Sequence, residues 1–179
     1  MTAKSLAVGA TAPDFELPEA FGGTVRLSEV LSRGTALLAF YPSDFGVMCA
    51  VELKMLQSLL PRFQALNATV LGISTNSVIT HSAWKEHMRF TFPLLSDYYG
   101  QVSDSLGVLV GEEIHSGYML GRCLRAVYII DRERRVRYFW FTEDHASEPD
   151  YDELLEVCSE LQLSTAPSPA DRTPGTAKP

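Results

Sequence analysis

The stretch that decides the fold is Phe40-Tyr-Pro-Ser-Asp-Phe-Gly-Val-Met-Cys-Ala-Val-Glu-Leu53, which joins a buried strand to a helix. Before it, residues 35–41 form an apolar run of strand length, and Pro42 ends the strand because proline offers no backbone donor to a sheet. After it, leucines and a methionine recur at helical spacing over residues 51–60. Cys49 therefore falls in or beside the first turn of a helix. Free N–H groups and the helix dipole favour a thiolate there, so we predict a nucleophilic thiol with a lowered pKa.

Length and composition fit one soluble globular domain. The chain has 179 residues, of which 46% are hydrophobic, and a formal net charge of −7. This charge argues against a nucleic-acid partner, and no apolar stretch approaches the roughly 20 residues that cross a bilayer, so we expect no membrane span. The N-terminus lacks a charged segment followed by a long apolar one, and the three cysteines contain no Cys-x-x-Cys pair. We therefore expect a cytoplasmic protein with free thiols.

The rest of the chain alternates between strand and helix patterns, which predicts an α/β domain with parallel strands joined by crossover helices. Residues 164–179 are rich in Ser, Thr, Ala and Pro, so we expect a single domain over residues 1–163 followed by a disordered, proline-rich tail. The expected elements are a hairpin of residues 12–17 and 24–27, a strand at 68–74, a helix at 78–89, an extended piece at 92–95, a short helix at 102–106, an antiparallel pair at 124–130 and 136–141, and a helix at 151–161.

These residues resemble the peroxiredoxins, thiol peroxidases with an active-site loop of the form Pro-x-x-x-Thr/Ser-x-x-Cys. The loop here reads Pro42-Ser-Asp-Phe-Gly-Val-Met-Cys49, and residues 8–18, 92–97 and 124–131 are similar to other family segments in the family's order. The resemblance covers about residues 5–162. It implies a thioredoxin-like fold with a central mixed β-sheet flanked by helices and an N-terminal β-hairpin. Because no long arm with a Val-Cys-Pro motif follows, the chain looks more like the peroxiredoxin Q, or bacterioferritin comigratory protein, branch.

The resemblance implies a role for each residue of the site. Cys49 is expected to attack one peroxide oxygen, and Arg125 to stabilise both the thiolate and the departing charge, since arginine stays protonated and offers several donors. Pro42 would shield the thiolate, and Glu52 would position Arg125, although Glu52 fits an ordinary first-turn carboxylate equally well. No bound cofactor is expected, and the four histidines show no metal-ligand spacing.

The loop departs from the family at Gly46, where the family has a Thr or Ser whose hydroxyl bonds the thiolate and the peroxide. Losing such a donor can cost on the order of a hundredfold in rate. The chain also lacks the resolving cysteine that the peroxiredoxin Q branch often carries five residues after the first, because Lys54 stands there.

Two other thiols are candidates for resolving a sulfenic acid on Cys49. Cys158 lies among leucines at helical spacing, which favours a buried structural thiol. Cys123 would face the same pocket as Arg125 if the strand already begins at residue 123, since alternate residues of a strand share a face. It fits an ordinary thiol in the preceding glycine-containing loop, residues 111–121, equally well. The sequence supports two alternatives equally: a one-cysteine mechanism with an external thiol as resolver, and a mechanism with an intramolecular disulfide.

The function that the sequence predicts is reduction of hydrogen peroxide or small organic hydroperoxides, with electrons returned by thioredoxin or a similar thiol donor. The protein would be a monomer or a homodimer. A redox sensor or interaction protein on the same scaffold is the alternative, made plausible by Gly46. Another thioredoxin-like oxidoreductase is disfavoured because there is no Cys-x-x-Cys motif.

Overall fold

The computed structural model describes residues 5–111, 119–142 and 147–165. A five-stranded sheet in the order β5-β4-β3-β6-β7 forms its centre, and a separate hairpin pairs β1 with β2. The strands are β1 (Glu16–Pro18), β2 (Thr24–Arg26), β3 (Thr35–Phe40), β4 (Ala68–Ser74), β5 (Leu94–Ser96), β6 (Arg125–Ile130) and β7 (Val136–Thr142). The helices are α1 (Leu27–Leu31), α2 (Val47–Ala65), α3 (Val78–Met88), α4 (Gln101–Ser105) and α5 (Tyr151–Thr165).

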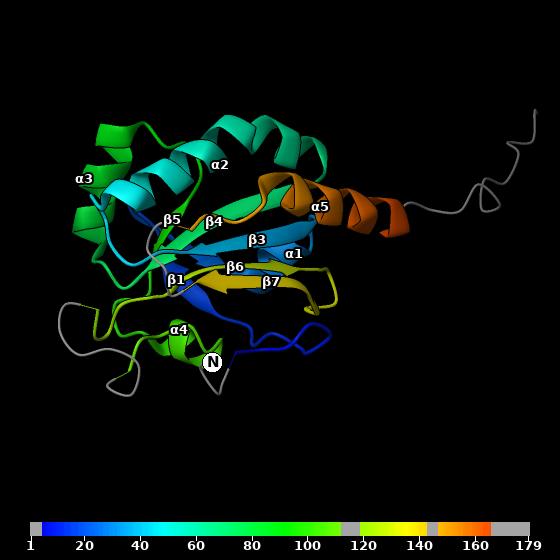
Figure 1. Cartoon of the computed structure of the whole chain (residues 1–179), viewed down its shortest axis with the longest axis horizontal. Helices are drawn as coiled ribbons and strands as arrows, with labels where there is room; N and C mark the ends of the chain where they lie inside the picture. The colour runs from blue at the N-terminus through cyan, green and yellow to red at the C-terminus, as the bar shows by residue number, and fades with distance from the viewer. Residues whose placement is uncertain (1–4, 112–118, 143–146, 166–179) are drawn as a thin grey trace, which may run out of the picture.

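The sheet is mixed, as predicted. Strands β3, β4 and β5 run parallel, whereas β6 is antiparallel to β3 and β7 is antiparallel to β6. Helices α2, α3 and α5 cover one face and α4 lies on the other side (Figure 1). The expected central sheet, flanking helices and N-terminal hairpin are thus confirmed.

Two hydrophobic clusters, one on each face of the sheet, make up the core. Alternate residues of β3 divide between them: Leu38 and Phe40 belong to the cluster packed against α1 and α4, which we call the lower cluster. Leu37 and Ala39 belong to the cluster packed against α2, α3 and α5, which we call the upper cluster. Because β3 is fully buried, both faces of its short apolar run are covered, as is common for central strands of sheets flanked by helices.

Most element bounds differ from the predictions by a few residues, and two of the differences assign residues to a helix that was not expected to include them. Leu27, expected to end the second hairpin strand, instead begins α1. The Asp14 side chain accepts a hydrogen bond from the Ser28 N–H, and Leu27, Val30 and Leu31 bury their side chains at helical spacing. Helix α5 continues past residue 161 to Thr165, so it includes Ser164, and residues 166–179 of the expected tail lie outside the described part of the chain.

Candidate active site

Cys49 lies in the first turn of α2, as the sequence predicted. The helix begins at Val47 with Gly46 as its N-cap, and the N–H of Ala50 donates to the Gly46 carbonyl over 2.8 Å. Phe45 adopts a φ of 60°, in the left-handed region, and turns the chain from β3 into the helix. The Cys49 side chain is only 4% exposed and belongs to the upper cluster. The thiol is therefore held at a helix start under a nearly closed surface.

Arg125 reaches the sulfur from the neighbouring strand. It is the first residue of β6, and the antiparallel register that pairs Phe40 with Ala126 brings the start of β6 beside the loop that follows β3. One guanidinium nitrogen, Nη2, lies 3.8 Å from Cys49 Sγ. The other, Nη1, donates to Glu52 Oε2 and lies 3.4 Å from the Met48 carbonyl oxygen. The structure thus brings together three of the residues singled out from the sequence.

Glu52 completes this group from the same helix as Cys49. The two residues are three positions apart, so they share a face of α2. The Glu52 side chain is fully buried and forms an ion pair with Arg125, which is itself 4% exposed. Within the described residues, Glu52 Oε1 and Arg125 Nε have no hydrogen-bond partner.

Burial is the largest influence on the pKa values of Cys49 and Glu52. It raises the pKa of the Cys49 thiol, whereas a backbone hydrogen bond of Ser43 and the charge of Arg125 lower it. The negative charge of Glu52 raises the Cys49 pKa further. Burial also raises the pKa of Glu52 to about 7, against the opposing influence of Arg125. The lowered Cys49 pKa predicted from the helix start is therefore not found, because the thiol is enclosed and has an acidic neighbour.

The loop before the helix surrounds the sulfur without offering a hydroxyl. Pro42 is buried, and the Ser43 hydroxyl donates to the Asp44 carbonyl over 3.0 Å rather than to the sulfur. A Cβ atom placed on Gly46 would lie 3.0 Å from Cys49 Sγ and 3.2 Å from the Ser43 carbonyl oxygen. Position 46 therefore adjoins the sulfur directly, and any side chain there needs a small shift of its neighbours.

A buried polar cluster that sequence reasoning missed holds the same loop. The Asp44 carboxylate forms an ion pair with His81, with Nδ1 and Oδ2 2.9 Å apart, and accepts a hydrogen bond of 2.9 Å from the Tyr41 hydroxyl. His81 Nε2 lies 3.1 Å from the Leu95 carbonyl oxygen. These contacts join the loop after β3 to α3 and β5. Parallel strands end at one edge of the sheet, which is the signal that could have placed Asp44 and His81 together.

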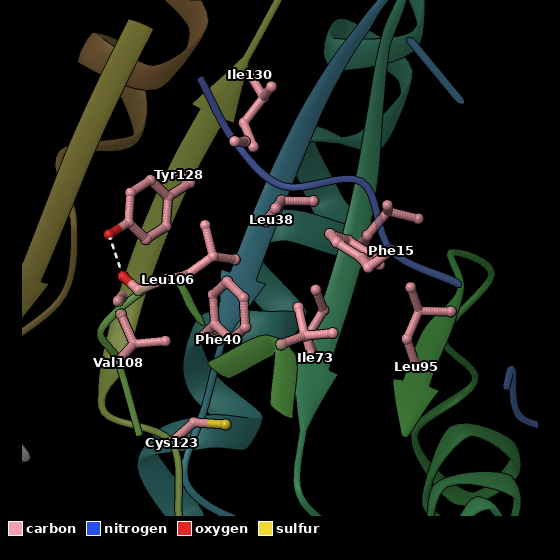
Figure 2. Packing of buried hydrophobic residues seen from close by; sticks show 14 of the residues in the cluster. Phe15, Leu38, Phe40, Ile73, Leu95, Leu106, Val108, Cys123, Tyr128 and Ile130 are labelled. Atoms are coloured by element: carbon pink, nitrogen blue, oxygen red, sulfur yellow. Dashed lines mark hydrogen bonds between the residues drawn. The ribbon is translucent and has the colours of Figure 1, made fainter. Parts of the chain in front are cut away.

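Cys123 does not face the pocket of Arg125. Strand β6 begins at Arg125, so the regular alternation that would align residues 123 and 125 does not extend to Cys123. Cys123 instead belongs to the lower cluster, among the residues drawn in Figure 2, and its sulfur lies 3.2 Å from the Ser103 hydroxyl. Burial raises the pKa of Cys123 to about 12. The structure therefore places this thiol on the face of the sheet opposite to Cys49.

Cys158 shares the upper cluster with Cys49 but lies toward the other end of α2. Gln162, one turn after Cys158, donates to the carbonyl of Ala65, the last residue of α2. Cys49 is near the start of that helix. Burial raises the pKa of Cys158 to about 12, so the surroundings of this thiol fit the buried structural role that the leucine spacing favours.

The described residues offer neither a cluster of metal ligands nor a membrane-spanning helix. No group of three or more His, Cys, Asp or Glu side chains there is placed to hold a metal ion. None of the described helices combines the length and apolar character needed to cross a membrane.

A cysteine in the first turn of a helix, with an arginine on its sulfur and a thioredoxin-like sheet beneath it, defines a class of thiol-based proteins, and comparison with known proteins gives the family. The sequence profile of the AhpC/TSA family matches residues 8–139, and the chain belongs to this family, the peroxiredoxins. The family resemblance inferred from the sequence and its thioredoxin-like fold are thus confirmed.

Relatives of more than one branch are similar to the chain. A chloroplastic 2-Cys peroxiredoxin of Spinacia oleracea is 32% identical over 94% of this chain, which spans 65% of that protein's length. A chloroplastic 2-cysteine peroxiredoxin of Chattonella marina var. antiqua is 33% identical over 89% of this chain and 83% of its own. The crystal structure of peroxidoxin BcpB from Mycobacterium tuberculosis superposes with a TM-score of 0.76 and 32% identity, covering 87% of this chain and 98% of BcpB.

Proposed function

We propose that this protein is a thiol-dependent peroxidase that reduces hydrogen peroxide and small organic hydroperoxides through Cys49. The thiolate attacks one peroxide oxygen, an S–O bond forms as the O–O bond breaks, and the departing oxygen leaves as an alcohol or water after taking up a proton. Sulfur is oxidised to a sulfenic acid and the peroxide is reduced. The observation that carries this proposal is the Arg125 guanidinium, which donates toward both Cys49 Sγ and Glu52. A fixed cation there stabilises the attacking thiolate and the departing charge.

The sulfenic acid would be recycled by an external thiol, thioredoxin or a similar donor. The support for this choice is the position of the other two thiols, Cys123 on the opposite face of the sheet and Cys158 toward the far end of α2. All three cysteines are unpaired, which fits the reducing cytoplasm as the site of action. The protein would act as a monomer or a homodimer.

Intact-mass spectrometry after one equivalent of hydrogen peroxide tests this proposal. We expect the wild-type chain to gain oxygen, the Cys123→Ser and Cys158→Ser variants to do the same, and the Cys49→Ser variant to remain unchanged. Adding thioredoxin should then restore the original mass. Loss of two hydrogens that depends on Cys49 and one other cysteine would instead reveal an intramolecular disulfide. No rapid mass change in the wild type would contradict the peroxidase function.

A redox sensor with weak peroxidase activity is the second candidate, and Gly46 favours it. The loop offers the sulfur no hydroxyl at this position, and burial raises the Cys49 pKa. A peroxide rate close to that of a free small thiol would support the sensor, whereas repeated turnover with thioredoxin would support the enzyme.

The Gly46→Ser variant is expected to react with peroxide up to about a hundredfold faster than the wild type, because its hydroxyl adds a donor beside the sulfur and the developing charge. The matched control is Gly46→Ala, which introduces the same Cβ atom 3.0 Å from Sγ without the hydroxyl. Second-order rate constants for the oxidation of Cys49 measure the difference between the two variants. Equal rates in both would show that the missing hydroxyl does not limit the reaction.

A further inference from the structure

The site contains two buried acids and one cation that touches both. Arg125 directs Nη1 to Glu52 and Nη2 to Cys49, so each acid lies against a different nitrogen of the guanidinium. Cys49 and Arg125 are 4% exposed and Glu52 is fully buried. Among the ion pairs of the described residues, Arg125 is the only partner of Glu52. The site therefore has one positive charge available for two groups that can each become negative.

Burial makes double ionisation of this site unfavourable. With one anion the three groups have no net charge, whereas two anions leave an uncompensated negative charge out of water, which the low dielectric penalises. Either acid can supply the single anion, because both lie against the same guanidinium. An ionised Glu52 thus opposes ionisation of Cys49, and the reverse holds equally.

We propose that Cys49 and Glu52 share one proton across Arg125, so that the carboxyl group is protonated when the thiol is ionised. In this exchange the S–H bond of Cys49 breaks and an O–H bond forms on Glu52, no electron is transferred, and the site remains neutral. Glu52 Oε2 is engaged by Arg125, and Oε1 has no partner among the described residues, so Oε1 is the atom that can hold the proton. The inference rests on the proposed function, because it concerns how the nucleophilic thiolate arises.

The surroundings of Glu52 raise the pH at which its carboxyl group becomes protonated. Burial raises the Glu52 pKa to about 7 and the negative charge of Glu148, which precedes α5, raises it as well. Tyr151, at the start of α5, donates a hydrogen bond of 2.7 Å to Glu148 and has a pKa raised by burial, so its hydroxyl stays neutral. With Arg125 from β6 and Cys49 from α2, these are the charged and titratable groups of the described residues that influence Glu52. Protonation of this carboxyl group as the pH falls through about 7 leaves Arg125 available to compensate a thiolate on Cys49.

The first test is a pH titration of thiolate absorbance in the Cys123→Ser/Cys158→Ser background, without peroxide. Replacing Glu52 with Gln is expected to raise the ionisation constant of Cys49 at least about tenfold, since coupled groups interact by more than about one pKa unit. A Glu52 that only positions Arg125 predicts the opposite, because a displaced guanidinium stabilises the thiolate less. The matched control is Glu86→Gln, an exposed carboxyl on α3, which should leave the Cys49 titration unchanged.

The second test measures the same coupling from both acids together. By thermodynamic linkage, the two pKa values of the wild-type pair should sum to more than the Cys49 pKa of Glu52→Gln plus the Glu52 pKa of Cys49→Ser, with Glu52 followed by carbon NMR of labelled glutamate. An unchanged or raised Cys49 pKa in Glu52→Gln, or equality of the two sums, would overturn proton sharing. Neither titration depends on turnover, so a protein that failed as a peroxidase would still give a clear result.

Discussion

Replacing Arg125 with methionine is expected to slow the reaction of Cys49 with hydrogen peroxide by about a hundred- to a thousandfold, the cost of losing one preorganised donor to developing charge. Arg125 Nη2 is 3.8 Å from the sulfur, and the guanidinium is almost completely buried, so water would not replace it readily. The methionine side chain retains much of the aliphatic volume but has no charge. Rapid-quench alkylation followed by mass analysis gives the rate of Cys49 oxidation directly.

The control for this prediction is Arg125→Lys, which keeps the charge but loses the planar fork that engages Cys49 and Glu52 at once. We expect an intermediate rate for this variant. Urea unfolding of both variants separates a lost donor from a disturbed fold, since Glu52 loses its buried partner in the methionine variant. A rate loss of less than about tenfold in a folded Arg125→Met protein would show that this cation is not the main source of transition-state stabilisation.

The His81→Ala variant is expected to lose about 3–5 kcal/mol of unfolding free energy, the usual cost of removing one partner from a buried ion pair. The His81 ring is fully buried, contacts Asp44 at 2.9 Å and lies 3.1 Å from the Leu95 carbonyl oxygen. Its loss leaves the Asp44 carboxylate with the Tyr41 hydroxyl as its remaining side-chain partner of this cluster. Urea denaturation followed by circular dichroism measures the change.

Two comparisons make this stability prediction specific. His87→Ala removes an exposed histidine from the same helix and should change the unfolding free energy by no more than about 0.5 kcal/mol. The double variant Asp44→Ala/His81→Ala should cost less than the sum of the two single changes, because the pair is lost only once. A cost below about 1 kcal/mol for His81→Ala would mean that the ion pair and its hydrogen bonds contribute little to holding the loop.

Local signals in the sequence were sufficient for most of the elements. The run at residues 68–74 was predicted with the bounds that β4 has, and α3 and β7 differ from their predictions by a single residue at one end. The missed helix α1 is short, and a tertiary contact between Asp14 and Ser28 helps to fix its first turn. Such contacts join segments that are distant along the chain, so hydrophobic periodicity alone does not reveal them.

The candidate site was likewise predictable from the sequence only in part. The family loop and the helix start located Cys49, and the family's arginine motif selected Arg125, but the sulfur-to-guanidinium distance follows from the register of β6 on β3. A strand position facing Arg125 and a loop position fitted Cys123 equally well from sequence, and the structure places it in the lower cluster, because strand alternation holds only where the backbone is regularly extended. The direction of the Cys49 pKa was also wrong from sequence, since burial depends on the whole upper cluster.

The sequence by itself determined the family, the order of strands and helices apart from α1, the nucleophile candidate at a helix start and the missing hydroxyl at Gly46. All of these depend on residue identity and on neighbours within a few positions. Only the tertiary structure decided that Cys49 and Glu52 are both buried against Arg125, that Asp44 and His81 fasten the loop to α3, and that the other two thiols lie away from the reactive one. The physical reason is that burial and charge pairing are set by segments far apart in the chain, which the sequence does not place in space.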